Sequence, residues 1–391
     1  MEAFVIESRE ALLLAVTGGL FLVQVLYQLL LYLRIPRHNR ASASQPLPTD
    51  NDCLPLSVII YAHEACEDLK RNLPHILMQD YPEFEVIVIT DGADDGTLDY
   101  LTLLRKQHAH LRHSFVPDSS RYISHKKLGL TLGIRAARHD WLVMTDADCR
   151  PQGNQWLRFM ARHFNTPGTQ IVLGYSSYER KKGWLHKRIA YDNLFAAMRY
   201  LGFALSGHPY MGIGRNLAYR KDLYYAHKGF SQHLSLLRGD DDLFVNRVAN
   251  GENTQVETQA EAVVLRRACT RAKDWREEKI GYTSTARLYR GMQRYGAGLE
   301  TLTRLLFHAA WLTTAAVCAL HGHWLGMGCA MMAFLLRLLL QMWVVNRNAK
   351  TLGESRRYYL TLPMFDILQP LQSLRWKLTC LLRKKSEFLR R

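Results

Sequence analysis

Two carboxylates lie one residue apart at positions 146 and 148, directly after an apolar run. Residues 141–144 are Trp-Leu-Val-Met, and Cys-Arg-Pro follows the pair. This pattern predicts a buried strand that delivers Asp146 and Asp148 into a turn. Because residues i and i+2 of an extended segment point to the same side, both carboxylates can face one site. Such a pair suits a hard divalent cation, although an isolated Asp-x-Asp sequence is also typical of a solvated turn.

Short apolar segments alternate with helical patterns before this pair. We predict strands at 56–61, 86–89, 113–116 and 141–146, and helices at 69–78, 97–107 and 126–138. The alternation predicts a parallel α/β sheet with helices on both faces. Ligands bind such sheets at the carboxyl ends of the strands. Asp91 and Asp146 each end a predicted strand, so we expect them in one cleft.

Three apolar stretches are long enough to cross a bilayer, which takes roughly 20 residues in a helix. Residues 11–33 carry no charge, and they are too long for the apolar part of a signal peptide. Residues 305–320 and 324–345 are separated by His-Gly-His and predict a helical hairpin. Arg337 lies inside the second of these helices, where it either snorkels or faces protein. The stretch 358–374 contains Pro363, Pro370 and Asp366, which favours a helix in the membrane interface over a fourth span.

Basic residues predict the orientation of these segments. Lys and Arg gather after residue 33, after residue 345 and at the end of the chain, whereas the hairpin tip has none. By the positive-inside rule, the N-terminus is outside, and the central domain and the C-terminal tail are cytoplasmic. Three spans satisfy every basic cluster, and a fourth would place the tail outside.

The composition narrows the class of partner. The net charge of +16 fits anionic lipid headgroups and a phosphorylated substrate. Nucleic acid is the usual rival for a basic protein, but the sequence has no zinc finger, no basic region with heptads and no RNA-binding aromatic signature. The seven Cys residues are scattered without a C-x-x-C pair, which favours a reduced domain without zinc or disulfides.

Four ordered motifs carry a family resemblance. They are Gln-Asp-Tyr-Pro at 79–82 with Thr-Asp-Gly-Ala-Asp-Asp-Gly-Thr at 90–97, Asp-Ala-Asp-Cys-Arg-Pro at 146–151, Gly-Arg-Asn-Leu-Ala-Tyr-Arg at 214–220, and Gly-Asp-Asp-Asp at 239–242. Together they resemble the family 2 glycosyltransferases over about residues 56–279. The resemblance implies a GT-A (nucleotide-diphospho-sugar transferase) fold, α/β and Rossmann-like, here with N-terminal and C-terminal transmembrane helices.

The resemblance also implies roles for the acidic residues. Asp91 would bind the base or ribose of a nucleotide-sugar donor, with a helix cap as the structural alternative. Asp146 would lie near the ribose and the cation, and Asp148 would ligate Mg²⁺ or Mn²⁺. Asp241 is the candidate general base, and Asp240 is also assigned to the catalytic group. Asp240 and Asp242 are rivals of Asp241, because three adjacent carboxylates leave the register open and also suit the solvated start of a helix.

Several positions depart from the family pattern or allow two interpretations. Glu64 is a candidate nucleotide contact whose register is shifted by about one residue. Residues 275–279, Trp-Arg-Glu-Glu-Lys, replace the Gln-x-x-Arg-Trp segment of chain-holding synthases, which favours non-processive transfer. Trp275 either stacks on a sugar or anchors its segment at the membrane. Four basic residues are candidate contacts to the diphosphate, with solvated surface charge as the alternative: Lys126, Lys127, Arg215 and Arg271.

These observations predict a bacterial inner-membrane, multi-pass, inverting glycosyltransferase that moves a sugar from a nucleotide-diphosphate donor to a lipid-linked or glycan acceptor. The alternatives are a processive polysaccharide synthase and a catalytically silent scaffold that binds nucleotide sugar. We expect an N-terminal anchor at 1–40, a linker at 41–55 and a glycosyltransferase domain at 56–300. A transmembrane hairpin at 301–350 and an interfacial helix with a basic tail at 351–391 would follow.

Overall fold

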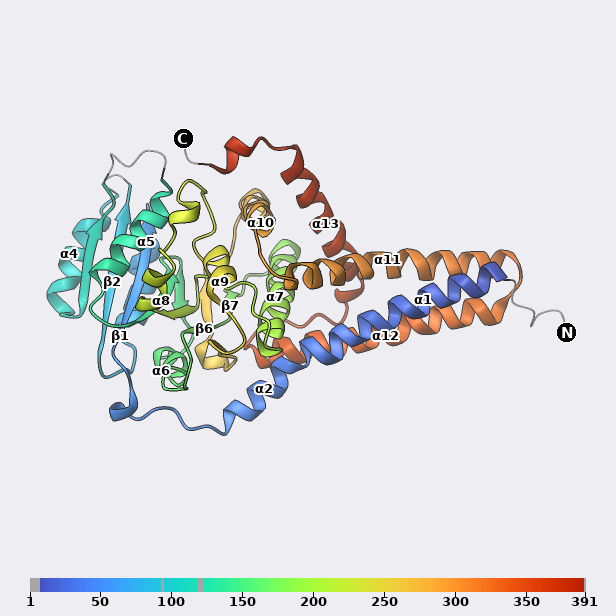
Figure 1. The fold of residues 1–391 in the computed structure, drawn as a ribbon, viewed down its shortest axis with the longest axis horizontal. Coiled ribbons are helices and arrows are strands. Elements are labelled where there is room, and N and C mark those ends of the chain that lie inside the picture. Colours follow the sequence, from blue (N-terminus) through green and yellow to red (C-terminus); the bar gives the residue numbers. More distant parts are fainter. Residues whose placement is uncertain (1–7, 93–94, 118–122, 390–391) are drawn as a thin grey trace.

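The computed structural model describes residues 8–92, 95–117 and 123–389. Ala93 and Asp94 of the predicted nucleotide-binding segment and Arg390 and Arg391 of the basic tail lie outside these residues. An α/β domain occupies one end of the molecule, and long helices extend away from it to the other end (Figure 1).

The central sheet has seven strands in the order β3-β2-β1-β4-β8-β6-β9. β1, β2, β3 and β4 are parallel, and their bounds lie within two residues of the predicted strands. β1 and β2 are almost continuously buried, as expected for strands covered on both faces. The bounds of the seven strands are Leu56–His63 (β1), Phe84–Asp91 (β2), Leu111–Phe115 (β3), Trp141–Asp146 (β4), Ile171–Leu173 (β6), Leu217–Arg220 (β8) and Thr254–Val256 (β9).

The four predicted strands are parallel, but the later strands of this sheet, for which no prediction was made, do not all continue that direction. β8 runs antiparallel to both β4 and β6. A buried apolar run indicates that a strand is covered on both faces but not in which direction it runs, and these later strands are only three or four residues long. Met144 of β4 pairs with Leu217 of β8, so residues 214–216 lie beside the carboxyl end of β4.

A second sheet continues the same edge of the domain. Its strands are β5 (Cys149–Pro151), β10 (Val264–Arg266) and β7 (Ser176–Tyr178), in the order β5-β10-β7. β10 is antiparallel to β5 and pairs Arg266 with Cys149. This pairing places Arg266 next to the second carboxylate of the Asp146–Asp148 pair.

Helices cover both faces of the sheet, and three of them coincide with predicted helices. These are α3 (Cys66–Leu77), α4 (Thr97–Gln107) and α5 (His125–Ala136). The later α-helices of the domain are α6 (Trp156–Ala161), α7 (Trp184–Leu205), α8 (Lys221–Ala226), α9 (Asp242–Val248) and α10 (Ala272–Ala286). Short 3₁₀ turns occur at Asp50–Asp52, Ser231–His233, Ala260–Ala262 and Lys385–Phe388.

Among the described residues, three helical segments have the length and apolar composition needed to cross a membrane, as predicted. The first extends over Arg9–Ala43 and comprises α1 (Ser8–Leu26), a π-helical turn (Tyr27–Tyr32) and α2 (Arg34–Ala43). The others are α11 (Gln293–Leu320) and α12 (Trp324–Thr351), which form the hairpin. α13 (Leu362–Leu382) is helical but is not one of these three segments, and it leads back along the α/β domain (Figure 1).

Arg337 faces protein and not lipid. Its guanidinium donates to both carboxylate oxygens of Asp366 in α13, at 2.5 and 3.3 Å, and to the Gln24 side chain of α1 at 3.0 Å. Asp366 also accepts a bond from Gln341 and lies 2.8 Å from the His308 ring. This buried group joins α1, α11, α12 and α13, which explains how the apolar hairpin accommodates an arginine.

Replacing Arg337 by Leu should lower the free energy of unfolding by about 3–5 kcal/mol, because the buried Asp366 carboxylate loses its closest guanidinium. Arg347→Leu on the same helix is the matched control, since its guanidinium lies over the Trp343 ring at 5.7 Å. Denaturant unfolding of the full chain in detergent measures both. Equal losses in the two variants would contradict the importance of the Asp366 pair.

Candidate active site

Asp91 is the last residue of β2, and polar aromatic side chains surround its carboxylate. The Tyr61 hydroxyl donates to its Oδ2, and His125 Nδ1 lies 2.8 Å from its Oδ1. His63 Nδ1 lies 3.3 Å from Oδ2. Asp91 itself is 7% exposed, and a Cβ on the neighbouring Gly92 would lie 3.3 Å from Glu64 Cγ. The sequence analysis assigned no role to these two histidines; the adjacency of His125 to Lys126 is the one signal that could have indicated it.

Lys126, in the first turn of α5, joins two acidic segments. Its Nζ lies 3.1 Å from Asp146 Oδ1 at the end of β4 and 3.1 Å from Asp240 Oδ2 before α9. One ammonium group therefore lies between carboxylates that are 94 residues apart in the sequence. Burial alone would raise the pKa of Asp146, but the positive charges of Lys126, Arg215 and Arg266 lower it below its ordinary value. Asp146 is thus held as an anion.

Asp146 and Asp148 form a candidate cation site. One carboxylate oxygen from each lies, with the Cys149 sulfur, in a group whose atoms are all within 4.8 Å of one another. Burial raises the pKa of the Cys149 thiol well above its ordinary value, and its Sγ donates to Asp148 Oδ1. Carboxylate oxygens are the ligands that hard cations prefer, whereas soft metals select sulfur. The two carboxylates therefore fit Mg²⁺ or Mn²⁺.

Ion pairs continue from Asp148 through Arg266, which no sequence pattern had indicated, to Glu278 and Arg215. Arg266 Nε donates to Asp148 Oδ2 at 2.8 Å, and its other end pairs with Glu278 at 2.6 Å. Glu278 pairs in turn with the buried Arg215 at 3.3 Å. The two arginines lower the pKa of Glu278 against the effect of burial. Glu278 occupies the position where the family has Gln, and here its negative charge holds two arginines beside the cation site.

Asp241 is the N-cap residue of α9, and hydrogen bonds hold its carboxylate in place. Oδ2 accepts the Gly214 N–H at 2.9 Å and the Tyr282 hydroxyl at 3.0 Å, and Oδ1 accepts the Asp242 N–H at 2.8 Å. Burial and the neighbouring Asp240 raise the pKa of Asp241 above its ordinary value, although Lys126 opposes them. A carboxylate of raised pKa is a better proton acceptor, as a general base requires.

Asp242 differs from Asp240 and Asp241 in its environment, because its side chain is completely buried. Its side chain is 0% exposed, and Oδ2 accepts hydrogen bonds from Thr285 and Tyr289 of α10 and the turn after it. Asp240 and Asp241 line the adjacent cavity, whereas Asp242 does not. Of the three adjacent carboxylates, Asp240 and Asp241 are therefore the two that line the cavity.

Because the Asp242 carboxyl is buried, we expect the free energy of unfolding to depend on pH. Burial, reinforced by Asp241, raises the pKa of Asp242 from 3.8 to about 7. The folded state therefore keeps a proton that the unfolded chain releases, so stability present below pH 3.8 is lost as the pH rises to about 7. Asp242→Asn cannot ionise and should gain stability relative to the wild type over this range. Unfolding at a series of pH values, with the exposed Asp222→Asn as control, tests this; parallel pH profiles of wild type and Asp242→Asn would contradict it.

A cavity of about 650 Å³ opens beside Asp240 and Asp241. Lys126 and Tyr282 line its inner end, and α10, the C-terminal part of α13 and the segment Leu236–Arg238 form the walls. Its apolar lining residues are Leu236, Leu237, Ile280, Leu288, Leu381 and Phe388, and its arginines are Arg238, Arg287 and Arg383. Glu277 and Glu387 line it too, and Arg383 is paired with Glu277 at 2.7 Å, so the walls next to Asp241 are apolar and charged.

Three sequence candidates lie elsewhere. Trp275 is 4% exposed, packs edge-on against Trp376 of α13 and carries Arg188 over its ring, an arrangement that favours anchoring over sugar stacking. Lys127 is fully buried and donates to the carbonyls of His233, Leu236 and Arg238, so it fixes a cavity wall. Arg271 pairs with Asp274 in solvent. By contrast, Lys126 and Arg215 lie in the charged site and are not solvated surface charges.

Comparisons with known proteins give the family and the fold that this chain resembles. Residues 57–227 match the family model of glycosyl transferase family 2. A curated relative, the poly-β-1,6-N-acetyl-D-glucosamine synthase of Staphylococcus epidermidis, is 27% identical over 93 residues, which are 24% of this chain and 21% of that protein. The match thus spans about a fifth of that relative's length.

Solved structures extend the likeness. The mannosyltransferase PcManGT from Pyrobaculum calidifontis, in complex with GDP-Man and Mn²⁺, superposes with a TM-score of 0.52 at 17% identity, covering 93% of this chain and 98% of that one. S. aureus TarS 1-349 in complex with UDP gives a TM-score of 0.41 at 13% identity, covering 77% and 89%. Residues 57–227 are thus similar to glycosyl transferase family 2, and the fold of the chain is of the GT-A type.

Proposed function

We propose that this protein is a membrane-anchored, inverting glycosyltransferase that moves a sugar from a nucleotide-diphosphate donor to a lipid-linked or glycan acceptor. The single observation that carries the proposal is the position of Lys126, which joins Asp146 at the β4 end to Asp240 beside the cavity. A donor side and an acceptor side thereby share one charged centre. The family 2 match supports assigning transferase chemistry to it.

The donor side would consist of Asp91, Glu64 and the pair Asp146–Asp148. Asp91 would hold the nucleoside, and Asp146 and Asp148 would hold Mg²⁺ or Mn²⁺, which when bound neutralises the charge of a diphosphate leaving group. Lys126 and Arg215 would contribute positive charge to the same diphosphate. In PcManGT a complex with GDP-Man and Mn²⁺ is known, and the donor and cation of the present protein are inferred by the same chemistry.

Asp241 would act as the general base. It would take a proton from the acceptor hydroxyl as that oxygen attacks the anomeric carbon, and the sugar–phosphate bond would break on the opposite side. Such a displacement inverts the anomeric centre. The hydrogen bonds from Gly214 and Tyr282 fix the carboxylate in place, so little reorganisation is needed when the proton arrives.

The cavity supports an acceptor that emerges from the bilayer. Its apolar residues would contact a lipid or the apolar face of a glycan, and Arg238 and Arg287 would contact phosphate groups, whereas Arg383 is paired with Glu277. One wall is α13, the helix predicted to lie in the membrane interface. Anchoring the domain to the bilayer would raise the effective concentration of such an acceptor.

For topology, we propose a multi-pass protein of the bacterial inner membrane with the α/β domain in the cytoplasm. The three candidate spans and the basic residues beside them support this orientation. A C-terminal fluorescent protein that folds only in the cytoplasm should be bright, and alkaline phosphatase at the same position should be inactive. The reverse pattern would refute the orientation.

A processive polysaccharide synthase is the second candidate, because the curated relative is named as a poly-β-1,6-N-acetyl-D-glucosamine synthase. Product analysis separates the two. Purified full chain in detergent should first show which UDP-, GDP- or dTDP-sugar raises its melting temperature in the presence of Mn²⁺. That donor should then extend lipid acceptors by one or a few sugars. Long homopolymer would favour the synthase, and a panel without any thermal shift or transfer would refute the proposed function.

A further inference from the structure

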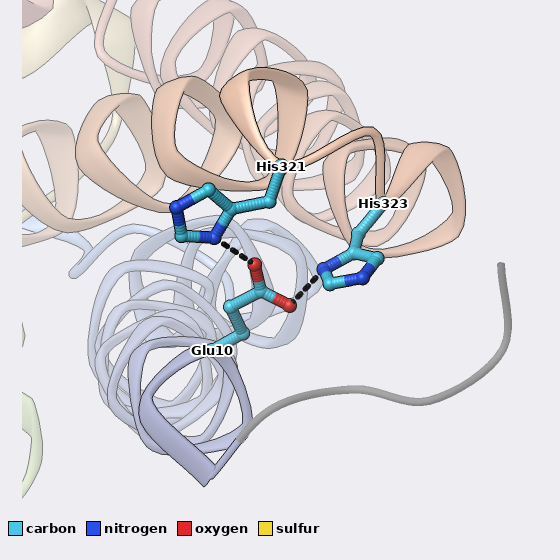
Figure 2. Close-up of side chains that lie close together, drawn as sticks. All are labelled: Glu10, His321 and His323. Atoms are coloured by element: carbon cyan, nitrogen blue, oxygen red, sulfur yellow. Dashed lines mark hydrogen bonds and ion pairs between the residues drawn. The ribbon is translucent and has the colours of Figure 1, made fainter. Parts of the chain in front are cut away.

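Three side chains of types that commonly bind metal ions meet at the end of the helix bundle that lies farthest from the α/β domain (Figures 1 and 2). Glu10 lies in the first turn of α1, and His321 and His323 flank the turn between α11 and α12. His321 Nδ1 lies 2.9 Å from Glu10 Oε1, and His323 Nδ1 pairs with Oε2. The same three residues form a group with one ligand atom each within 4.8 Å of one another.

The backbone of the turn aims both imidazoles at the same carboxylate. Gly322 has a φ of +75°, a conformation that L side chains rarely adopt, and it lies between the two histidines. The His323 N–H donates to the Cys318 carbonyl at 2.7 Å, which closes the end of α11. Figure 2 shows the two rings converging on Glu10 from successive sides of this turn.

The carboxylate of this cluster is buried, which requires polar or charged partners for it. Glu10 is 1% exposed, whereas the side chains of His321 and His323 are 52% and 17% exposed. Among the described residues, Glu10 forms ion pairs with these two histidines. A buried carboxylate needs a cation or hydrogen-bond donors. Two imidazole nitrogens and one carboxylate oxygen are the ligand set of three-ligand zinc sites, which keep a fourth position open.

We propose that Glu10, His321 and His323 bind a divalent transition-metal ion of the zinc class. The ion would replace the hydrogen bonds of both Nδ1 atoms to Glu10, and each neutral ring would carry its proton on Nε2. Because the ligands come from α1 and from the hairpin turn, the ion would clamp the N-terminal helix to the hairpin. This site differs in chemistry from the all-carboxylate pair Asp146–Asp148, and it does not depend on the proposed transferase activity.

The experiment uses the full chain in detergent, stripped of metal and held in excess Mg²⁺ to occupy the carboxylate pair. Zn²⁺ titration should show one tight site and a raised melting temperature, and Co²⁺ should give the visible absorption of a low-coordinate cobalt centre with nitrogen ligands. The variant His321→Asn with His323→Asn should lose both signals. Asn places an amide nitrogen near the Nδ1 position and can still donate to Glu10, so the metal-free fold should persist.

His75→Asn is the matched control, since His75 is an exposed histidine of α3, and it should bind Zn²⁺ like the wild type. Glu10→Gln should reduce Zn²⁺ affinity and alter the Co²⁺ spectrum. Wild type that binds no Zn²⁺, or binds it no more tightly than the double Asn variant, would overturn the site. A Co²⁺ spectrum unchanged by Glu10→Gln would also overturn the three-ligand proposal.

Discussion

Asp241→Asn should reduce the rate of sugar transfer by about 10²- to 10⁴-fold, the range expected when a general base is removed. The substitution keeps the size of the side chain and an oxygen that can accept the Gly214 N–H. The substitution removes the carboxylate that would take the proton from the acceptor hydroxyl. Burial and the neighbouring Asp240 raise the pKa of that carboxylate. Donor affinity, measured by the thermal shift with nucleotide sugar and Mn²⁺, should change little. The defect therefore belongs in kcat.

Two variants make this result specific. Asp240→Asn should lose less activity if Asp241 is the base, because Asp240 is held by Lys126. Asp222→Asn replaces an exposed aspartate paired with Arg220 and should transfer at the wild-type rate. A fully active Asp241→Asn variant would refute the assignment, and an inactive Asp240→Asn beside an active Asp241→Asn would move the base to Asp240.

Asp148→Asn should have the second largest effect, a loss of about 10²-fold or more, since a bound cation contributes several kcal/mol of charge stabilisation to the transition state. The variant removes one of the two carboxylates of the cation site and the partner of Arg266. Activity should become insensitive to Mn²⁺ concentration. The thermal shift produced by Mn²⁺ with nucleotide should be lost as well.

Asp68→Asn is the neighbouring control for this substitution. Asp68 is half-buried and also pairs with an arginine, Arg267 at 2.8 Å, but it is not a member of the acidic pair. It should retain Mn²⁺-dependent transfer. Unchanged Mn²⁺ dependence in Asp148→Asn would show that the cation is bound elsewhere or that the reaction proceeds without it.

The first half of the domain could be predicted because its signals are local. The apolar runs of β1, β2 and β4 are buried on both faces, and Asp91 and Asp146 follow directly from the ends of two of them. In the parallel register, Tyr61 of β1 lies opposite Asp146, and His63 lies opposite Asp91. Position along a buried strand was therefore enough to place two acidic residues at one edge.

The second half of the site depends on contacts between distant segments. Arg266 reaches Asp148 because β10 pairs with β5, and Tyr282 reaches Asp241 because α10 packs beside α9. Neither contact leaves a pattern in the sequence near the residues involved. The Arg337–Asp366 pair is similar: composition revealed a charged residue in an apolar helix, but its partner lies on another helix.

The domain boundaries and the roles of the site residues remain predictions. α2 extends to Ala43, into the predicted linker at 41–55, and packs on the α/β domain through the bond from Asn39 to the Thr258 carbonyl. The remainder of the predicted linker, residues 44–55, contains one short 3₁₀ turn at Asp50–Asp52 and leads into β1.

The central claim is that acidic side chains from separate segments hold a cation and a nucleotide diphosphate at the end of β4. Anomalous scattering from crystals of the full chain grown with Mn²⁺ and the nucleoside diphosphate selected by the thermal-shift panel tests it most directly. We predict a manganese peak within about 2.0–2.3 Å of an Asp148 oxygen, the distance usual for a carboxylate ligand. A manganese peak remote from Asp146 and Asp148, beside a bound nucleotide, would contradict the claim.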